Sequence, residues 1–224
     1  GKLVGEASTG YSMYPEFNKK VWDDIYAFNP KMKFIYIMRD PVARIVSHYT
    51  HSYMRGYTRM PFKNAVLEMP EFINRTRYYT QIKPYLDLFG RDQVLLLTFE
   101  NFLAERNGSL ERLSSFLQID NQFQDLAQLH KNKAKEEVNI GLNRFVRHRI
   151  SNPYLRRIVS IFYKGFVGKS DVPPKMTEEL EEVIWRMLEL DIVQMENEIG
   201  RALMEWPTCR KFRYVQPAFQ SGQL

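Results

Sequence analysis

The feature that most constrains the fold is an apolar run that passes directly into a helix start. Lys33 to Met38 reads Lys-Phe-Ile-Tyr-Ile-Met, which is typical of a buried parallel strand. Asp40 and Pro41 follow after a single residue. Aspartate is a favoured N-cap and proline is favoured at the first helical position, so we predict a helix from Pro41 to about Arg55. Strand and helix therefore meet at one tight turn.

The same alternation continues on both sides of this turn. Gln93 to Phe99 is a further apolar run of strand type, and Lys2 to Glu6 predicts a short strand entered from upstream. Apolar residues at helical spacing predict helices over four further segments, residues 16–28, 62–69, 76–89 and 109–117. Strands that alternate with helices indicate an α/β fold, in which helices flank a parallel sheet.

The second half of the chain predicts a helical C-terminal part. Asp120 to Glu137 is polar and irregular, and we expect a loop there. Thr177, followed by two glutamates, is the expected start of a long helix. We predict one domain over residues 1–206 and an extended tail over residues 207–224.

Composition excludes several classes of protein. The chain has 224 residues and one cysteine, Cys209, so no internal disulfide or cysteine-rich metal site is possible. The chain contains no run of 18 apolar residues, so we predict no membrane span in it. The net charge of +6 favours anionic partners such as nucleotides or polyanionic glycans, and no nucleic-acid-binding motif accompanies it.

The helix from Pro41 carries a polar stripe beside the end of the preceding strand. Arg39 lies at the carboxyl end of that strand, where open α/β sheets place their ligands. Helical spacing puts one set of polar residues on a common face: Arg44, Ser47, His48, His51 and Arg55. With the positive potential of the helix N-terminus, this is a candidate anion site. The alternative is the solvated side of an amphipathic helix.

Residues 39–49 read Arg-Asp-Pro-Val-Ala-Arg-Ile-Val-Ser-His-Tyr. This string resembles the 3′-phosphate-binding motif R-D-P-x-x-R-x-x-S-x-Y of PAPS-dependent sulfotransferases. The likeness is greatest to the bacterial sulfotransferase-domain proteins and the related Golgi glycan sulfotransferases. Residues 4–11 resemble the family's G-E-x-S-x-x-Y strand end, residues 77–100 follow its helix-strand order, and Phe116-Leu117 fits its F-L-G region with Gln118 replacing the glycine.

The resemblance implies a P-loop-NTPase-like parallel sheet and a set of site residues. Arg39 and Ser47 match the residues that hold the 3′-phosphate of PAPS. Glu6 matches the glutamate that serves as general base in the glycan-modifying branch. His51 stands where some N-sulfotransferases carry a functional histidine, and His48 is the competing imidazole.

Other expectations concern the acceptor and the second half of the donor site. Arg77 and Tyr78 are candidates to line the acceptor cleft, and the basic segment 131–135 is a candidate to cover the nucleotide. The family's K-x-G-T-[ST] loop, which holds the 5′-phosphosulfate, is absent from the chain, so we expect that the first β-α unit lies upstream of Gly1. Ala7 stands where many Golgi members have lysine, which favours the bacterial group.

The implied activity is transfer of a sulfuryl group from PAPS to a hydroxyl or amine of an acceptor, with a saccharide or glycan favoured. Adenosine 3′,5′-bisphosphate is the second product, and no metal is required. Two alternatives are a P-loop small-molecule kinase and a non-catalytic module that binds polyanions. A bacterial cytoplasm is the favoured location, or the Golgi lumen if an upstream segment carries an anchor.

Overall fold

A two-stranded parallel sheet lies at the centre of the structure, a computed structural model that describes residues 4–17, 19–120, 174 and 176–214. Strand β1 (Phe34–Met38) pairs with β2 (Val94–Thr98) in one register from Phe34 opposite Val94 to Met38 opposite Thr98. The carboxyl ends of both strands therefore lie at the same edge. The α/β class and the parallel pairing are confirmed.

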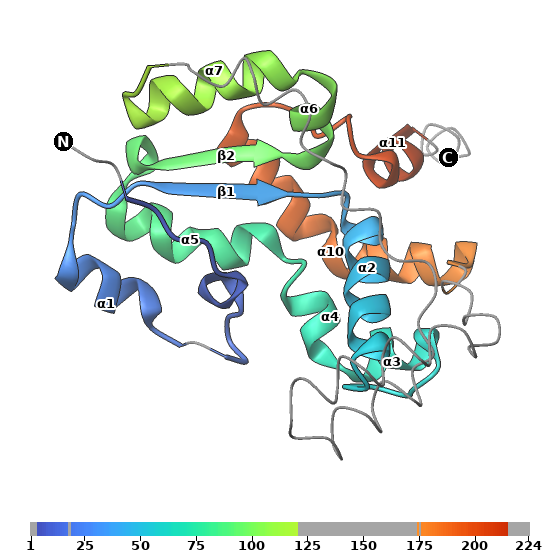
Figure 1. Cartoon of the computed structure of the whole chain (residues 1–224). Coiled ribbons are helices and arrows are strands. Elements are labelled where there is room, and N and C mark those ends of the chain that lie inside the picture. The colour runs from blue at the N-terminus through green and yellow to red at the C-terminus, as the bar shows by residue number, and fades with distance from the viewer. Residues whose placement is uncertain (1–3, 18, 121–173, 175, 215–224) are drawn as a thin grey trace, which may run out of the picture.

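Helices surround these two strands (Figure 1). Figure 1 shows α1 (Val21–Phe28) and α5 (Tyr78–Phe89) on one side of the sheet and α7 (Arg106–Leu117) on the other. The other described helices are α2 (Pro41–Met54), α3 (Phe62–Glu68), α4 (Pro70–Asn74), α6 (Phe99–Ala104), α10 (Glu178–Ile199) and α11 (Pro207–Tyr214), with short 3₁₀ turns at Thr9–Ser12 and Arg91–Gln93. None of the described helices is long and apolar enough to cross a bilayer.

The apolar core lies on the α5 side of β1. The Phe34 ring packs edge-on against Tyr85 and Phe89, at centroid distances of 5.0 and 4.6 Å. On the other face of the strand, Ile35 and Ile37 are 42% and 51% exposed. The prediction of a strand buried on both faces is therefore correct for only one face within the described residues.

One N-terminal prediction is wrong over its described residues, and another is right in kind but begins too early. Residues 4–6 form no strand, because the described ladder joins β1 only to β2 and offers these residues no partner. The helix expected from Glu16 begins only at Val21. Phe17, whose spacing suggested a packed helical face, is 71% exposed.

The extended tail expected from residue 207 is also wrong over its described part. Pro207–Tyr214 is helix α11, with Pro207 at the first helical position that proline favours. Its Cys209 is fully buried against the core. Residues 215–224 and the loop expected over residues 121–137 lie outside the described residues.

Gln118 occupies the position that the F-L-G resemblance gives to glycine. It caps α7 with φ 58° and ψ 46°, in the left-handed region. A glycine enters this region without steric cost, whereas other residues do so at a cost of about 1 kcal/mol. The backbone here therefore retains a glycine-type turn although the residue has changed.

A buried carboxylate from α10 caps the start of α5. Asp191 Oδ1 accepts from the Tyr79 amide at 2.9 Å, and Oδ2 accepts from the Thr80 amide at 2.8 Å and its hydroxyl at 2.7 Å. Burial raises the pKa of Asp191, and these hydrogen bonds oppose that rise. A helix end that would otherwise be unpaired is thus satisfied from 111 residues away.

Replacing Asp191 with alanine should destabilise the protein by about 2 kcal/mol, because two partly buried amides lose their acceptor. Urea denaturation of the variant and the wild type measures the change. Glu189→Ala, on the exposed side of the same helix, is the matched control and should change stability little. Equal stability of Asp191→Ala and the control would contradict the capping role.

Candidate functional site

The turn after β1 is held by a buried tyrosine. Tyr78 Oη donates to the Arg39 carbonyl at 2.6 Å and accepts from the Arg39 amide at 3.3 Å. The Tyr78 side chain is only 3% exposed. Both backbone groups of Arg39 are therefore fixed from within the core while its side chain projects outward.

Asp40 ties the same turn to the C-terminal segment. Asp40 Oδ1 accepts from the Ala43 amide at 2.9 Å and from Thr208 Oγ1 at 3.0 Å, and Oδ2 accepts from the Thr208 amide at 2.9 Å. The Asp40 amide donates to Glu100 Oε1 at 3.0 Å, and Glu100 Oε2 accepts from Trp206 Nε1 at 3.0 Å. We call Tyr78, Glu100, Trp206 and Thr208 the turn clamp.

The predicted N-cap of α2 is confirmed, and it changes the expected anion site. Pro41 has no amide hydrogen, and the Ala43 amide is taken by Asp40. The carboxylate of Asp40 thus already occupies much of the helix N-terminus that was expected to attract an anion. The Arg39 guanidinium lies 5.7 Å from the Phe99 ring centroid and is exposed.

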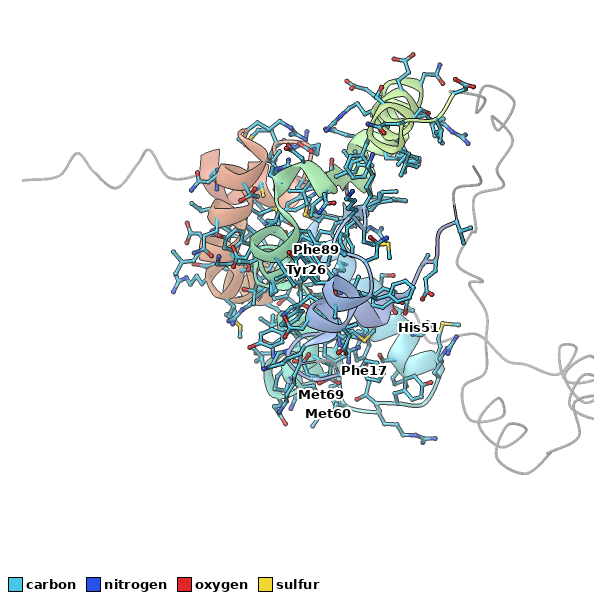
Figure 2. The ribbon with its side chains drawn as sticks, turned by 90° about the vertical axis from the view of Figure 1, so that its left-hand side faces the viewer. Phe17, Tyr26, His51, Met60, Met69 and Phe89 are labelled. Carbon is cyan, nitrogen blue, oxygen red and sulfur yellow. The ribbon has the colours of Figure 1, made fainter. Side chains whose placement is uncertain are left out.

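The polar stripe of α2 divides into two. Ser47, His51 and Arg55 are exposed, and Figure 2 shows His51 at the outer edge of the structure, on the side away from α10. Arg44 and His48 turn instead toward α4 and the segment that follows it. The prediction of one common stripe is wrong, because residues three apart on a helix differ in direction by about 60°.

Arg44, His48 and Arg75 form a half-buried cluster of two guanidiniums and one imidazole. Arg44 Nη1 donates to Thr76 Oγ1 at 3.0 Å, and Arg75 Nη1 lies 3.4 Å from His48 Nε2. Among the described residues, none of the three has a carboxylate within ion-pair distance. His48 Nδ1 and Arg75 Nε are buried without a described hydrogen-bond partner.

The two histidines of α2 have different surroundings. Burial, together with Arg44 and Arg75, lowers the pKa of His48 to about 4, so its imidazole is neutral near pH 7. Burial and Arg55 also lower the pKa of the exposed His51. His48 faces the interior, whereas His51 shares the exposed stripe with Ser47.

Glu6 lies away from this edge of the sheet. Tyr11 donates its hydroxyl to Glu6 Oε1 at 2.5 Å, and the Tyr11 carbonyl accepts from the Tyr85 hydroxyl at 2.6 Å. Tyr85 packs on Phe34, the first residue of β1. Arg39 follows the other end of this strand, roughly 17 Å away at about 3.3 Å per residue. The contacts therefore do not bring Glu6 beside Arg39.

The two predicted acceptor residues have other surroundings. Tyr78 is buried and its hydroxyl is used by Arg39, so it cannot line an open cleft as predicted. Arg77 is half-buried at the start of α5 and lies close enough to Asp191 to oppose the burial-driven rise of that carboxyl's pKa. The basic segment 131–135 lies outside the described residues.

Sequence reasoning missed three members of the turn clamp. Glu100 had a usable signal, since it follows β2 and parallel strands end at the same edge of a sheet. Trp206 and Thr208 had none, because they reach the turn from more than 100 residues away.

Two further features of the described residues concern metal binding and cavities. No group of three or more His, Cys, Asp or Glu side chains in the described ranges could hold a metal ion. A shallow groove of about 650 Å³ lies elsewhere, between α1, α5 and α10, and none of the predicted site residues lines it.

Comparisons with known proteins bear on the family and the fold. The profile of the sulfotransferase domain family matches residues 24–190. Human sulfotransferase 2B1 is 30% identical over 95 residues, which are 40% of this chain and 26% of that protein. The crystal structure of a sulfotransferase from Alicyclobacillus acidocaldarius is similar in fold, with a TM-score of 0.57 and 20% identity over 88% of this chain and 64% of that one.

The family match spans most of the chain, so the protein belongs to the sulfotransferase domain family. The chain covers about a quarter of the human relative and less than two thirds of the bacterial one. The resemblance seen in the sequence is thereby confirmed at the level of the family.

His48 should make stability depend on pH. Between its usual pKa of 6.5 and the folded value of about 4, the unfolded chain binds a proton that the folded protein does not, so stability falls as pH falls through this range. His48→Gln should lose less stability over the same range, as measured by urea denaturation at successive pH values. The pKa of His51 is also lowered, but this side chain is exposed, so His51→Gln should follow the wild-type curve more closely than His48→Gln does. Parallel curves for wild type and His48→Gln would contradict the prediction.

Proposed function

We propose that this protein is a PAPS-dependent sulfotransferase in which Arg39 and Ser47 hold the 3′-phosphate of the donor. The observation that carries the proposal is the exposed guanidinium of Arg39 on a turn whose backbone is fixed by Tyr78 and Asp40. A clamped backbone limits the conformations that binding must order, which favours recognition of a rigid anion.

The spacing of the two residues suits one phosphate group. Ser47 lies six residues after Pro41, the first residue of α2, about 9 Å along the helix axis at 1.5 Å per residue, and Arg39 precedes that helix start. A long arginine side chain that reaches back along the helix and a phosphate together span that separation. The guanidinium supplies paired donors and the hydroxyl supplies one more, so a dianion is satisfied from two directions.

Phe99 adds an aromatic surface beside this proposed phosphate site. It is 39% exposed, begins α6, and packs near the Arg39 guanidinium. Aromatic rings stack on nucleobases without regard to their hydrogen-bonding edges. We therefore propose that the Phe99 ring stacks on the purine of the donor.

The transfer itself moves one sulfuryl group and one proton. The acceptor oxygen or nitrogen forms a bond to sulfur, the bond from sulfur to the 5′-phosphate oxygen breaks, and adenosine 3′,5′-bisphosphate leaves. The acceptor proton must pass to a base. The sulfuryl group is carried on the 5′-phosphate, on the other side of the ribose from the 3′-phosphate, so the base need not lie beside Arg39. We propose Glu6 for this role, since its exposed carboxylate keeps one oxygen without a described partner, and His51 as the second candidate.

Of the alternatives, the kinase is disfavoured by the surroundings of Asp40. A kinase needs an acidic ligand for Mg²⁺ at a strand end. Asp40 is 4% exposed, and its two oxygens accept three hydrogen bonds from Ala43 and Thr208. A saccharide hydroxyl or amine remains our proposal for the acceptor.

Arg39→Ala should weaken binding of adenosine 3′,5′-bisphosphate roughly 10- to 100-fold, and Ser47→Ala should weaken it by a smaller factor, since a charge-assisted contact exceeds a neutral one. Titration calorimetry of the whole protein measures both, with ATP as the competing nucleotide. Arg112→Ala, an exposed arginine on α7, is the charge-matched control. Unchanged bisphosphate affinity in Arg39→Ala would remove Arg39 from the site.

Glu6→Gln should lower kcat by about 100-fold or more while bisphosphate affinity stays the same, because a lost base affects the transfer and not the donor. Sulfation assayed with labelled PAPS, together with calorimetry on the same samples, gives the two readouts. Glu111→Gln, an exposed glutamate on α7, should retain full activity. A fully active Glu6→Gln enzyme would transfer the role to His51.

A further inference from the structure

The loop that follows α2 presents cations and an aromatic ring to solvent. We call residues 55–60 the Tyr57 loop. Arg55 and Arg59 are exposed, Tyr57 is 69% exposed and Met60 is 37% exposed. Large aromatic side chains are usually buried in part, so an exposed tyrosine between two arginines is not accounted for by packing.

The Tyr57 loop is held in place by buried groups at its base. The Tyr57 amide donates to the Ser52 carbonyl at 2.9 Å, and the Met60 amide donates to Thr58 Oγ1 at 3.2 Å. The Met60 carbonyl accepts from the Tyr49 hydroxyl at 2.9 Å. Ser52 and Thr58 are 7% and 6% exposed. The exposure of Tyr57 therefore results from a fixed loop conformation.

The two arginines of the loop lack counter-ions among the described residues. Neither Arg55 nor Arg59 lies within 4.0 Å of a carboxylate of the described residues, whereas several other surface cations are paired. These pairs are Lys83–Asp87, Arg91–Glu198, Arg186–Glu182, Arg201–Glu205 and Lys211–Glu181. The Tyr57 loop thus carries positive charge that is free to attract an anion.

The loop is continuous with the proposed donor site. Ser47, His51 and Arg55 follow one another at four-residue intervals on the exposed side of α2, each step about 6 Å. His51 lies midway, at the outer edge of the structure in Figure 2. A ligand that extends from the proposed 3′-phosphate site along this helix face would therefore reach Arg55 and then Tyr57.

We propose that the Tyr57 loop is an acceptor subsite for an anionic saccharide. The Tyr57 ring takes a sugar face, and the guanidiniums of Arg55 and Arg59 take carboxylate or sulfate groups on the flanking residues. This assignment rests on the proposed function, since it places the acceptor beside the donor. A membrane surface fits less well, because the loop exposes two apolar side chains and no apolar helix face.

The test uses the whole protein with the double variant Arg55→Gln/Arg59→Gln, and Tyr57→Ala as a second variant that keeps both charges. The probe is hexagalacturonate, which carries a carboxylate on each ring, and its fully methyl-esterified form is the uncharged counterpart. Lys31→Gln/Arg112→Gln removes the same charge from exposed positions elsewhere. Calorimetry at low and high salt measures each affinity, and adenosine 3′,5′-bisphosphate is titrated in parallel.

We expect the double variant to bind hexagalacturonate at least about ten-fold more weakly, with a reduced salt dependence, and Tyr57→Ala to bind it about three-fold more weakly. Bisphosphate affinity should not change in either. The control variant should bind hexagalacturonate as the wild type does.

Several results would overturn the subsite. These are no binding of hexagalacturonate, equal binding by wild type and double variant, equal binding of the methyl ester, or an equal loss in the control variant. Stronger loop-dependent binding to vesicles rich in phosphatidylserine would assign the loop to a membrane instead. If the loop-dependent saccharide binding holds but bisphosphate does not bind the wild type, the subsite stands and the sulfotransferase proposal fails.

Discussion

The buried carboxylate of Asp40 is the interaction on which the arrangement of the site depends. It caps α2 through Ala43 and anchors α11 through the amide and hydroxyl of Thr208. A buried carboxylate is tolerated only when its oxygens are satisfied, and here three donors satisfy them. Arg39 precedes this carboxylate and Ser47 follows it on the helix that it caps. The geometry of the proposed phosphate site is thus set by a contact that no ligand touches.

Helix α2 separates two electrostatic environments. Its inward side carries Arg44 and His48 next to Arg75, without a carboxylate among the described residues, and desolvation there lowers the pKa of both Arg44 and His48. Its outward side carries Ser47 and His51, where water screens charge and a ligand can approach. The inward cations add to the positive potential of the helix, while the outward side chains make the contacts that we propose.

Local signals explain which parts of the fold were predictable. The Asp40-Pro41 turn, the two apolar strands and the Thr177 cap are each encoded within a few residues, and the structure confirms them. Contacts between distant segments were not predictable. Asp191 caps α5 from 111 residues away. Pro207 begins a helix rather than a tail because the residues after it, Thr208 and Cys209, are buried.

The candidate site shows the same division. The positions of Arg39 and Ser47 follow from one strand and one helix, and both side chains are exposed as a binding role requires. Tyr78 was misplaced because its partner, the Arg39 backbone, is 39 residues distant, and hydrophobic periodicity does not report such a contact.

The contact between Asp40 and Thr208, which are 168 residues apart, also affects the order in which the site can form during synthesis. At synthesis rates of about 5–20 residues per second, its two halves leave the ribosome on the order of ten to thirty seconds apart. During this interval the turn at Arg39 lacks the hydrogen bonds from Thr208 of α11, although its own strand and helix have already been synthesised.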